Sequence, residues 1–429
     1  MKEKFIKSTI ILLIGGFLTK ILGMLIKIIM ARIIGTKTLG TYMLILPTFS
    51  LLISLSQFGL PIALSKLISE ETRNNKNLFF TLLPLLVAIN ILLSILIVIT
   101  APIISTRLLH NDNTYLAILA MSLVIPFTST SSICRSYFFG KSRMFPHVLS
   151  NIIEDITRLL LLITTLPKII LYGTKYAVAY LVLINIISEI ASTIVLIFFL
   201  PKNIKITKKD FIPNKNYLKD SLKISIPNTS TRLIGSIGYF LEPIIISTIL
   251  LKVGYTTNYI TTEYGIISGY VIPLILLPSF FTLAISQALL PIISKEYTKG
   301  NKIYVKRKII QAIVLSLLIG IPVTIILVLK PAYFLNLIYH TNEGTTYIKI
   351  LAPICIFQYI QAPLASSLDA MAKSKDAFLA TLYGTIIRTT TLYLTSYLKI
   401  GFYSLIIATS LNILVVTFYE IKKVRKYLT

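Results

Sequence analysis

The sequence predicts an all-α, polytopic membrane protein with about twelve transmembrane helices in two six-helix lobes around a central cleft. Three observations support this fold class. The chain has 429 residues, 55% of them hydrophobic, and a mean hydropathy of +0.82, which is too apolar for a soluble domain. Apolar runs recur that are long enough to cross a hydrocarbon core of about 30 Å. Polar residues inside these runs also repeat between the two halves of the chain.

The predicted spans follow one another along the chain and lack the ten-residue alternation of a membrane β-barrel. We interpret the first run as a retained helix, because it is long and no small-residue cleavage site precedes Arg32. The predicted spans are 8–30, 41–62, 78–104, 115–138, 147–166, 176–200, 222–251, 264–290, 309–329, 347–370, 377–398 and 400–420.

The distribution of Lys and Arg predicts how these spans are oriented. With the N-terminus in the cytoplasm, 28 of the 42 basic residues fall in cytoplasmic segments and 9 in the opposite loops. We therefore expect a protein of the cytoplasmic (cell) membrane with both termini inside. The net charge of +26 does not indicate nucleic-acid binding, because a chain rich in Lys, Ile and Asn and free of Trp is typical of AT-rich coding bias. The other five basic residues lie inside predicted spans: Lys20, Lys27, Arg158, Arg232 and Arg388.

An internal repeat predicts the domain organisation. The segment Thr19–Gly23 recurs as Thr231–Gly235, Leu46–Phe49 as Leu277–Phe280, and Gly140–Ser142 as Ala372–Ser374. Parallel repeats of this kind are related by an axis along the membrane normal, and the substrate is handled between them. We expect an N-terminal lobe at 1–200, a basic cytoplasmic linker at 201–221 and a C-terminal lobe at 222–429.

Basic residues in the first helix of each half are the candidate substrate ligands. Lys20 and Lys27 share a helix face with two glycines, and Arg232 occupies the position equivalent to Lys20. A charge at this depth faces a cavity or serves a structural ion pair, and Lys27 can also snorkel to the interface. A cavity with Lys and Arg suits an anion such as a diphosphate. Gln57 and Gln287 stand at matched positions and either line the cleft or bond between helices.

Acidic residues in the predicted fifth and sixth spans allow two interpretations. Glu154 and Arg158 are four residues apart, which is the spacing of a local helical ion pair. Alternatively, Glu154, Asp155 or Glu189 takes part in proton or ion coupling. Arg388 is the repeat counterpart of Arg158 and belongs with the same candidates.

No motif in the sequence supports an enzyme. Three histidines are scattered without metal-ligand spacing, and two cysteines make neither a disulfide framework nor a metal site. Gly140-Lys141-Ser142 lacks the upstream glycine of a nucleotide-binding loop. We therefore expect no metal and no cofactor, and transport driven by the membrane potential, a proton or sodium gradient, or coupled metabolism.

Five segments carry a family resemblance. They resemble polysaccharide-type flippases of the multidrug/oligosaccharidyl-lipid/polysaccharide (MOP) superfamily, and most closely the stage V sporulation protein B group. The segments are Ala31–Tyr42, Gln57–Ala63, Gly140–Pro146, Ser150–Arg158 and Pro278–Pro291.

The resemblance implies a V-shaped pair of six-helix lobes that flips an undecaprenyl-linked saccharide outward by alternating access. Such an activity belongs to cell-wall or polysaccharide biogenesis and to sporulation. The expected partners are a lipid-linked oligosaccharide, the lipid bilayer and envelope-assembly proteins. In related lipid II flippases, basic cavity residues bind the diphosphate-sugar head group. The corresponding candidates here are Lys20, Lys27, Arg32 and Arg232.

Two other functions stay open at this point. Many of these relatives have fourteen helices, and the chain's twelve predicted spans bring it nearer in size to MATE-type drug or metabolite/cation antiporters. Such antiporters typically carry acidic residues in their lobes, whereas the first predicted span here contains lysines and no acid. The third hypothesis is a non-transporting membrane scaffold in envelope assembly, which the basic cytoplasmic loops suggest.

Overall fold

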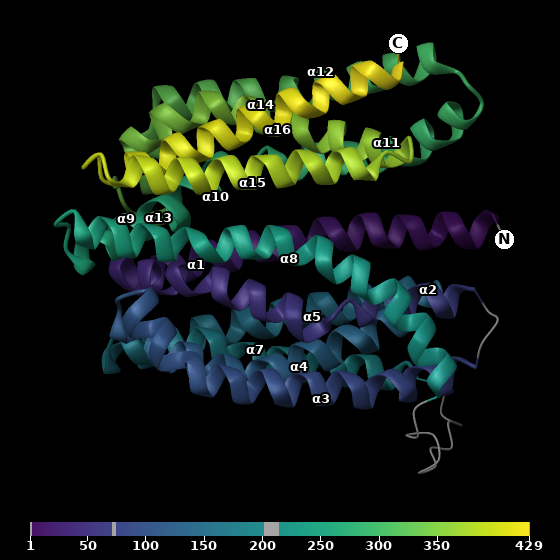
Figure 1. Ribbon diagram of the computed structural model, residues 1–429, viewed down its shortest axis with the longest axis horizontal. Helices are drawn as coiled ribbons and strands as arrows, with labels where there is room; N and C mark the ends of the chain where they lie inside the picture. Colours follow the sequence, from purple (N-terminus) through teal and green to yellow (C-terminus); the bar gives the residue numbers. More distant parts are fainter. Residues whose placement is uncertain (1, 71–73, 201–213, 429) are drawn as a thin grey trace. The chain divides into compact units, whose positions relative to one another are not determined.

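The structure, a computed structural model, describes residues 2–70, 74–200 and 214–428, which are almost entirely helical and include no strand. These residues form two compact units, Met1–Phe240 and Leu241–Thr429, and the division falls within helix α8, Lys215–Lys252 (Figure 1). Residues 201–213 of the predicted linker lie outside the described residues. The domain boundaries drawn from the repeat therefore stay a prediction.

Helix α1, Lys2–Gln57, contains the first two predicted spans as two helical segments that meet at a kink at Gly35. The connection expected between them, at 31–40, is shorter than predicted: it is a break at Gly35, whose φ of 67° is readily adopted by glycine. Ala31, Ile34 and Leu39 are all buried. A helix satisfies the backbone polar groups of such a buried apolar segment internally, which a loop cannot do.

The remaining elements of the first unit are a series of helices that pack around α4. Helix α4 packs against α2, α3 and α7, and α5 packs against α1 and α7 (Figure 1). Leucines of α2 and α3 and aromatic residues of α4 form a core in which most side chains are under 3% exposed. The elements are α2 (Leu60–Ser69), α3 (Asn75–Pro102), a π-helix (Ile103–Leu108), a 3-10 turn (Asp112–Thr114), α4 (Tyr115–Gly140), α5 (Met144–Thr164), α6 (Leu166–Ile169), a second 3-10 turn (Ile170–Tyr172) and α7 (Thr174–Phe198).

The turn between α1 and α2 brings the chain close to the first part of α8. Gly59 has φ 62°, and Pro61 follows it at the start of α2. A Cβ atom on Gly59 would lie 2.8 Å from the carbonyl oxygen of Ser225 and 2.9 Å from Oγ1 of Thr229. Glycine at this position therefore allows both the backbone conformation and the close approach of α8.

The second unit contains a span that bends. Thr257–Ile275 and Ser279–Thr298 meet at 51°, with Pro278 at the break. Leucines and isoleucines of α11, α12 and α14 form the core. The elements after α8 are α9 (Thr257–Gly265), a π-helix (Ile266–Val271), α10 (Ile272–Ile275), α11 (Ser279–Thr298), α12 (Lys302–Leu329), α13 (Pro331–Tyr339), α14 (Thr345–Ala370), α15 (Ser374–Ser396) and α16 (Tyr403–Leu428).

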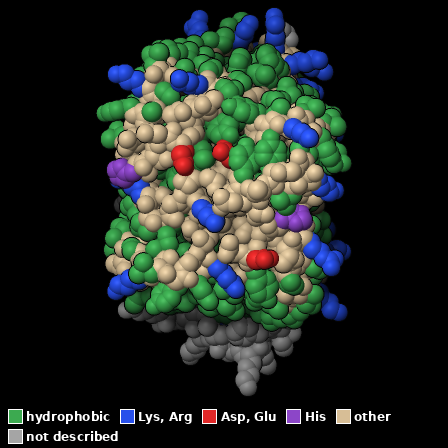
Figure 2. Space-filling view, turned by 90° about the vertical axis from the view of Figure 1, so that its left-hand side faces the viewer, with side chains coloured by type: hydrophobic (Ala, Val, Ile, Leu, Met, Phe, Trp, Pro, Cys, Tyr) green, Lys and Arg blue, Asp and Glu red, His purple; other side chains and the backbone are tan. Residues whose placement is uncertain are grey.

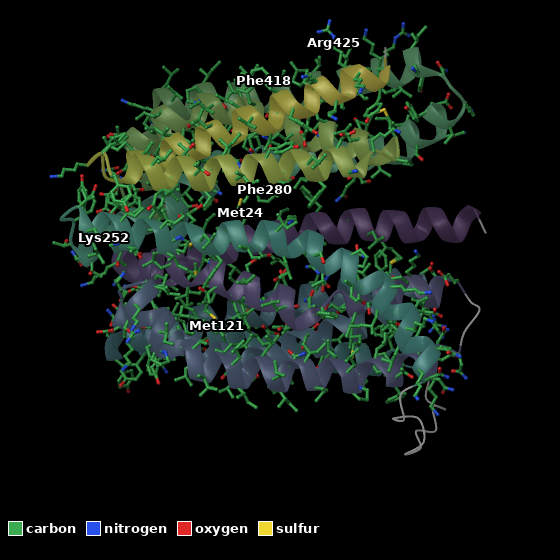
Figure 3. The ribbon with its side chains drawn as sticks, viewed as in Figure 1. Met24, Met121, Lys252, Phe280, Phe418 and Arg425 are labelled. Atoms are coloured by element: carbon green, nitrogen blue, oxygen red, sulfur yellow. The ribbon has the colours of Figure 1, made fainter. Side chains whose placement is uncertain are left out.

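Both units expose large apolar side chains, as expected of helices that contact lipid. Leu92 on α3 is 67% exposed and Leu318 on α12 is 64% exposed, and hydrophobic side chains cover much of the flanks in Figure 2. Other apolar side chains are buried between the helices of a unit. Figure 3 labels one of each kind: Met121 on α4 is fully buried, whereas Phe418 on α16 is 57% exposed. A soluble protein rarely exposes so much contiguous apolar surface.

The helices account for all twelve predicted spans. Among the described residues, seven helices are long and apolar enough to cross a membrane, and the bent pair adds an eighth. The other four predicted spans correspond to the two parts of α1, to α5 and to α15. The fold is therefore that of an all-α polytopic membrane protein, as predicted.

Candidate functional site

A network of buried charges joins three helices of the first unit. Arg135 on α4 donates from Nη2 to Glu154 on α5, to Oε2 of Glu189 on α7 at 2.8 Å and to Oγ of Ser192 at 2.7 Å. The other oxygen of Glu154, Oε1, accepts from Arg158 at 2.6 Å. The predicted local pair is therefore present, but it is part of a larger network centred on Arg135.

The network is poorly accessible to solvent. The side chains of Arg135, Glu154 and Glu189 are 15%, 12% and 8% exposed. Charges so far from water require close partners, and each carboxylate here has at least one guanidinium within hydrogen-bonding distance. Asp155, in contrast, makes only a longer contact, 3.6 Å from Arg158. Among these groups, Asp155 is the carboxylate that is least committed to an ion pair.

A cavity of about 280 Å³ opens onto this network. It lies among α1, α4, α5 and α7, so four helices contribute to one polar space. Arg135, Arg158, Glu154 and Glu189 provide charged groups of both signs. The other lining residues are neutral: Phe49, Ile53, Gln57, Thr128, Ser132 and Asn185.

The structure brings two of the predicted substrate ligands together at this cavity. Arg232 on α8 donates from Nη1 to Oε1 of Gln57 at 3.2 Å, and Gln57 lines the cavity. Arg232 is exposed and Gln57 is half-buried. The contact therefore links an exposed cation on α8 to the polar space between α1 and α4.

The other predicted ligands are exposed on their helices. Lys20, Lys27 and Arg32 are exposed along α1 in the first unit. Gln287 is exposed on α11 in the second unit. Their grouping into one substrate site stays a prediction.

Arg388 has a partner that sequence spacing did not reveal. Its Nη2 lies 2.5 Å from Oε2 of Glu242, which is on α8, 146 residues earlier in the numbering. Tyr264 donates its hydroxyl to the other oxygen of Glu242 at 3.1 Å. The second unit thus holds its own buried ion pair between α8 and α15.

Arg135 is the main residue that sequence reasoning missed. It was counted with the cytoplasmic loop, because it stands near the end of the fourth predicted span, but it lies within α4. The available signal was an imbalance, since Glu154, Asp155 and Glu189 place three acids in neighbouring spans whose one basic residue is Arg158. The described residues contain no cluster of three His, Cys, Asp or Glu that could hold a metal ion.

Comparisons with known proteins identify the class to which this fold and these sites belong. The chain belongs to the polysaccharide biosynthesis protein family, whose family model matches residues 5–297. The MatE family model also matches residues 243–394.

Two bacterial proteins are similar to the chain over most of its length. Stage V sporulation protein B of Bacillus subtilis (strain 168) is 31% identical over 90% of this chain and 77% of its own length. The lipid II flippase MurJ of the same organism is 21% identical over 90% of this chain and 76% of its own length.

Solved structures show the same fold. An inward-facing multidrug resistance MATE family transporter of the MOP superfamily aligns with a TM-score of 0.78, at 15% identity, over 96% of this chain and 94% of its own. A MOP superfamily transporter from Pyrococcus furiosus Vc1, described as having a binding pocket of reverse polarity, aligns with a TM-score of 0.64 at 16% identity over 98% of this chain and 95% of its own. The prediction of a two-lobe, twelve-helix fold, which rested on the repeat and on the family resemblance, is thereby confirmed.

Proposed function

We propose that this protein moves an anionic lipid-linked saccharide, of the polyprenyl-diphosphate class, across the cytoplasmic membrane by alternating access. The observation that carries the proposal is the set of exposed cations inside apolar helices of the first unit. Lys20 and Lys27 are exposed on α1, and Arg232 is exposed on α8 beside Gln57. Cations within a membrane span are costly and usually mark a substrate path.

The sign and type of these charges favour a diphosphate head group. Lysine acts as a point charge, whereas the guanidinium of arginine binds phosphate oxygens in a fork. A diphosphate that crosses hydrocarbon without such partners meets a large desolvation barrier. A hydrated path with cations lowers this barrier without any covalent chemistry, so the proposed activity is transport and not catalysis.

The buried network supplies a candidate site for coupling to the membrane potential or to a proton or sodium gradient. Asp155 has only a 3.6 Å contact with Arg158, and Glu189 shares Arg135 with Glu154. Binding or release of one proton or sodium ion at these carboxylates would change which of them is paired with a guanidinium. Moving one charge through a potential of about 100 mV is worth about 2.3 kcal/mol.

The same carboxylates favour a second candidate function, a MATE-type drug or metabolite/cation antiporter. In that case Asp155 and Glu189 would exchange a cation for a cationic substrate, and the exposed lysines of α1 would be dispensable. Efflux of cationic dyes from proteoliposomes, dependent on an ion gradient and lost in Asp155→Asn, would support the antiporter against the flippase.

Reconstitution into proteoliposomes tests the flippase directly. A labelled polyprenyl-diphosphate disaccharide is supplied in one leaflet, and its appearance in the other leaflet is followed by enzymatic accessibility. We expect the double variant Lys20→Gln/Arg232→Gln to lose at least tenfold in rate. The matched control Lys302→Gln, which neutralises an exposed lysine at the start of α12, should keep the wild-type rate. Equal rates for the double variant and the control would overturn the proposal.

A further inference from the structure

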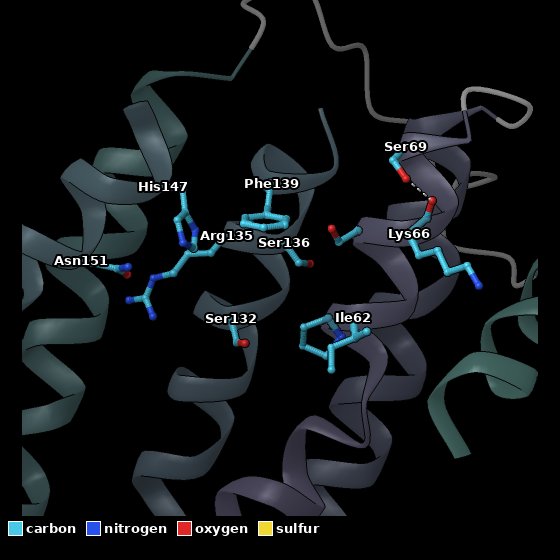
Figure 4. Close-up of a pocket in the computed structure, with 11 residues that line it drawn as sticks. Ile62, Lys66, Ser69, Ser132, Arg135, Ser136, Phe139, His147 and Asn151 are labelled. Atoms are coloured by element: carbon cyan, nitrogen blue, oxygen red, sulfur yellow. Dashed lines mark hydrogen bonds between the residues drawn. The ribbon is translucent and has the colours of Figure 1, made fainter. Parts of the chain in front are cut away.

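A second and larger pocket lies in the first unit, between α2, α4 and α5. Its volume is about 590 Å³, which is within the range of small-molecule sites. Figure 4 shows Arg135 and His147 close together on one side of this pocket, with Ser132 and Ser136 on α4, and Lys66 on α2 extending away from them.

This pocket shares a wall with the cavity of the buried network. Ser132 and Arg135 line both spaces. All three contacts of Arg135 with Glu154, Glu189 and Ser192 are made by the single atom Nη2. The guanidinium therefore has further donor capacity beyond the atom that holds the carboxylates.

Two buried nitrogen atoms in the pocket wall have no hydrogen-bond partner among the described residues. They are Nε of Arg135 and Nδ1 of His147. The imidazole of His147 packs edge-to-face against Phe139, with ring centroids 5.6 Å apart, which holds its plane. Buried polar atoms are usually paired, so Arg135 and His147 each keep an unused hydrogen-bonding atom beside the pocket.

The chemistry of the lining selects an anion. Its polar side chains are those of Lys66, Arg135, His147, Asn151 and three serines, Ser65, Ser69 and Ser136, in addition to the shared Ser132. Among the described residues, no Asp or Glu lines this pocket, in contrast to the 280 Å³ cavity on the other side of Arg135. Guanidinium, hydroxyl and amide donors together match the oxygens of a phosphate group.

We propose that this pocket binds a phosphate-bearing anion, and that the anion competes with Glu154 and Glu189 for the guanidinium of Arg135. Occupation of the pocket then weakens the contact between α4 and α7, because Arg135 on α4 is the group that holds Glu189 and Ser192 on α7. The pocket is thereby a second anion site, separate from the exposed cations of α1 and α8. The inference goes beyond the proposed function, and binding can be measured without any transport.

Binding of inorganic pyrophosphate to the purified full-length protein tests the site by isothermal titration calorimetry. The test variant is the charge-balanced double substitution Arg135→Gln/Glu189→Gln, which removes one cation together with one of its anions. The matched control is Arg388→Gln/Glu242→Gln, which removes the buried ion pair of the second unit. We expect affinity to fall at least tenfold in the test variant and to stay within twofold in the control.

A second variant with a smaller structural change distinguishes loss of the site from misfolding. His147→Phe keeps a ring against Phe139 and removes Nδ1, so it should fold as the wild type does and weaken pyrophosphate binding about threefold to tenfold. A second arm repeats the titration with undecaprenyl diphosphate in nanodiscs. Weaker binding in the Arg135 and His147 variants, in either titration, supports the site. If the pyrophosphate titration shows it, the ligand is a free phosphate compound; if the undecaprenyl diphosphate titration shows it, the ligand is a lipid head group. Binding that is unaffected by both variants in both arms, or no binding at all, would overturn the proposal.

Discussion

Replacing Arg135 by Gln gives the largest stability effect that we expect from a single change in the buried network. The substitution leaves Glu189 with no guanidinium partner, whereas Glu154 keeps Arg158 at 2.6 Å. The side chains of Arg135 and Glu189 are only 15% and 8% exposed. The free-energy costs measured for buried ion pairs therefore apply, and the smaller ones measured for surface pairs do not. Removing one partner of such a pair costs about 3–5 kcal/mol. This corresponds to about two to nearly four powers of ten in the unfolding equilibrium constant.

Equilibrium unfolding by SDS in mixed micelles measures this cost. Arg135→Gln/Glu189→Gln should recover part of the loss, with a coupling free energy of about 0.5–3 kcal/mol, because the second substitution removes the unpaired carboxylate. Lys299→Gln is the matched control, since its pair with Glu296 at 3.0 Å is solvent-exposed and should contribute no measurable stability. The reasoning is refuted if Arg135→Gln destabilises no more than Lys299→Gln, or if the double variant is no more stable than Arg135→Gln.

Three further predictions concern other parts of the fold. Gly59→Ala should lower the unfolding free energy by about 1–3 kcal/mol in the same assay, because its φ is 62° and a Cβ would lie 2.8 Å from the carbonyl oxygen of Ser225; an unchanged midpoint would contradict this. At the first turn of α15, before the predicted span, hydrogen bonds from Lys423 at 2.7 Å and from Tyr427 lower the pKa of Asp376. This carboxylate therefore stabilises the fold above its unfolded-state pKa, and the contribution is lost as the pH falls through its lowered folded-state pKa. Asp376→Asn should abolish that part of the pH dependence of thermal unfolding, and an identical pH profile would count against it. A protease site fused to the C-terminus should be cleaved only from the cytoplasmic side in inside-out and right-side-out vesicles, and cleavage from outside would reverse the proposed orientation.

Hydropathy and the repeat predicted the fold well because a bilayer leaves few alternatives. Each crossing must satisfy its own backbone hydrogen bonds, so an apolar run of sufficient length predicts a helix. The same reasoning placed a ten-residue loop at 31–40, where the structure has two helical segments that meet at Gly35. The apolar residues Ala31, Ile34 and Leu39 are buried there, and a helix satisfies the backbone polar groups of such a segment better than a loop does.

The candidate site was predicted only in part, because its contacts join residues far apart in the sequence. Helical spacing indicated the pair of Glu154 with Arg158, which is a local interaction. Arg135 and Glu189 are 54 residues apart, and Glu242 and Arg388 belong to different helices, so no periodicity could match them. The contact of Arg232 with Gln57 was also not predicted, although both residues had been singled out.

The central claim is that exposed cations of the first unit recognise an anionic head group, and a comparison of head groups tests it most directly. Proteoliposomes are given a polyprenyl-diphosphate disaccharide or an uncharged glycolipid with the same tail and sugars. We predict that the wild type moves the diphosphate at least ten times faster, and that Lys20→Gln/Arg232→Gln removes this preference. Equal rates for the two lipids in the wild type, or a preference that survives the double substitution, would contradict the account.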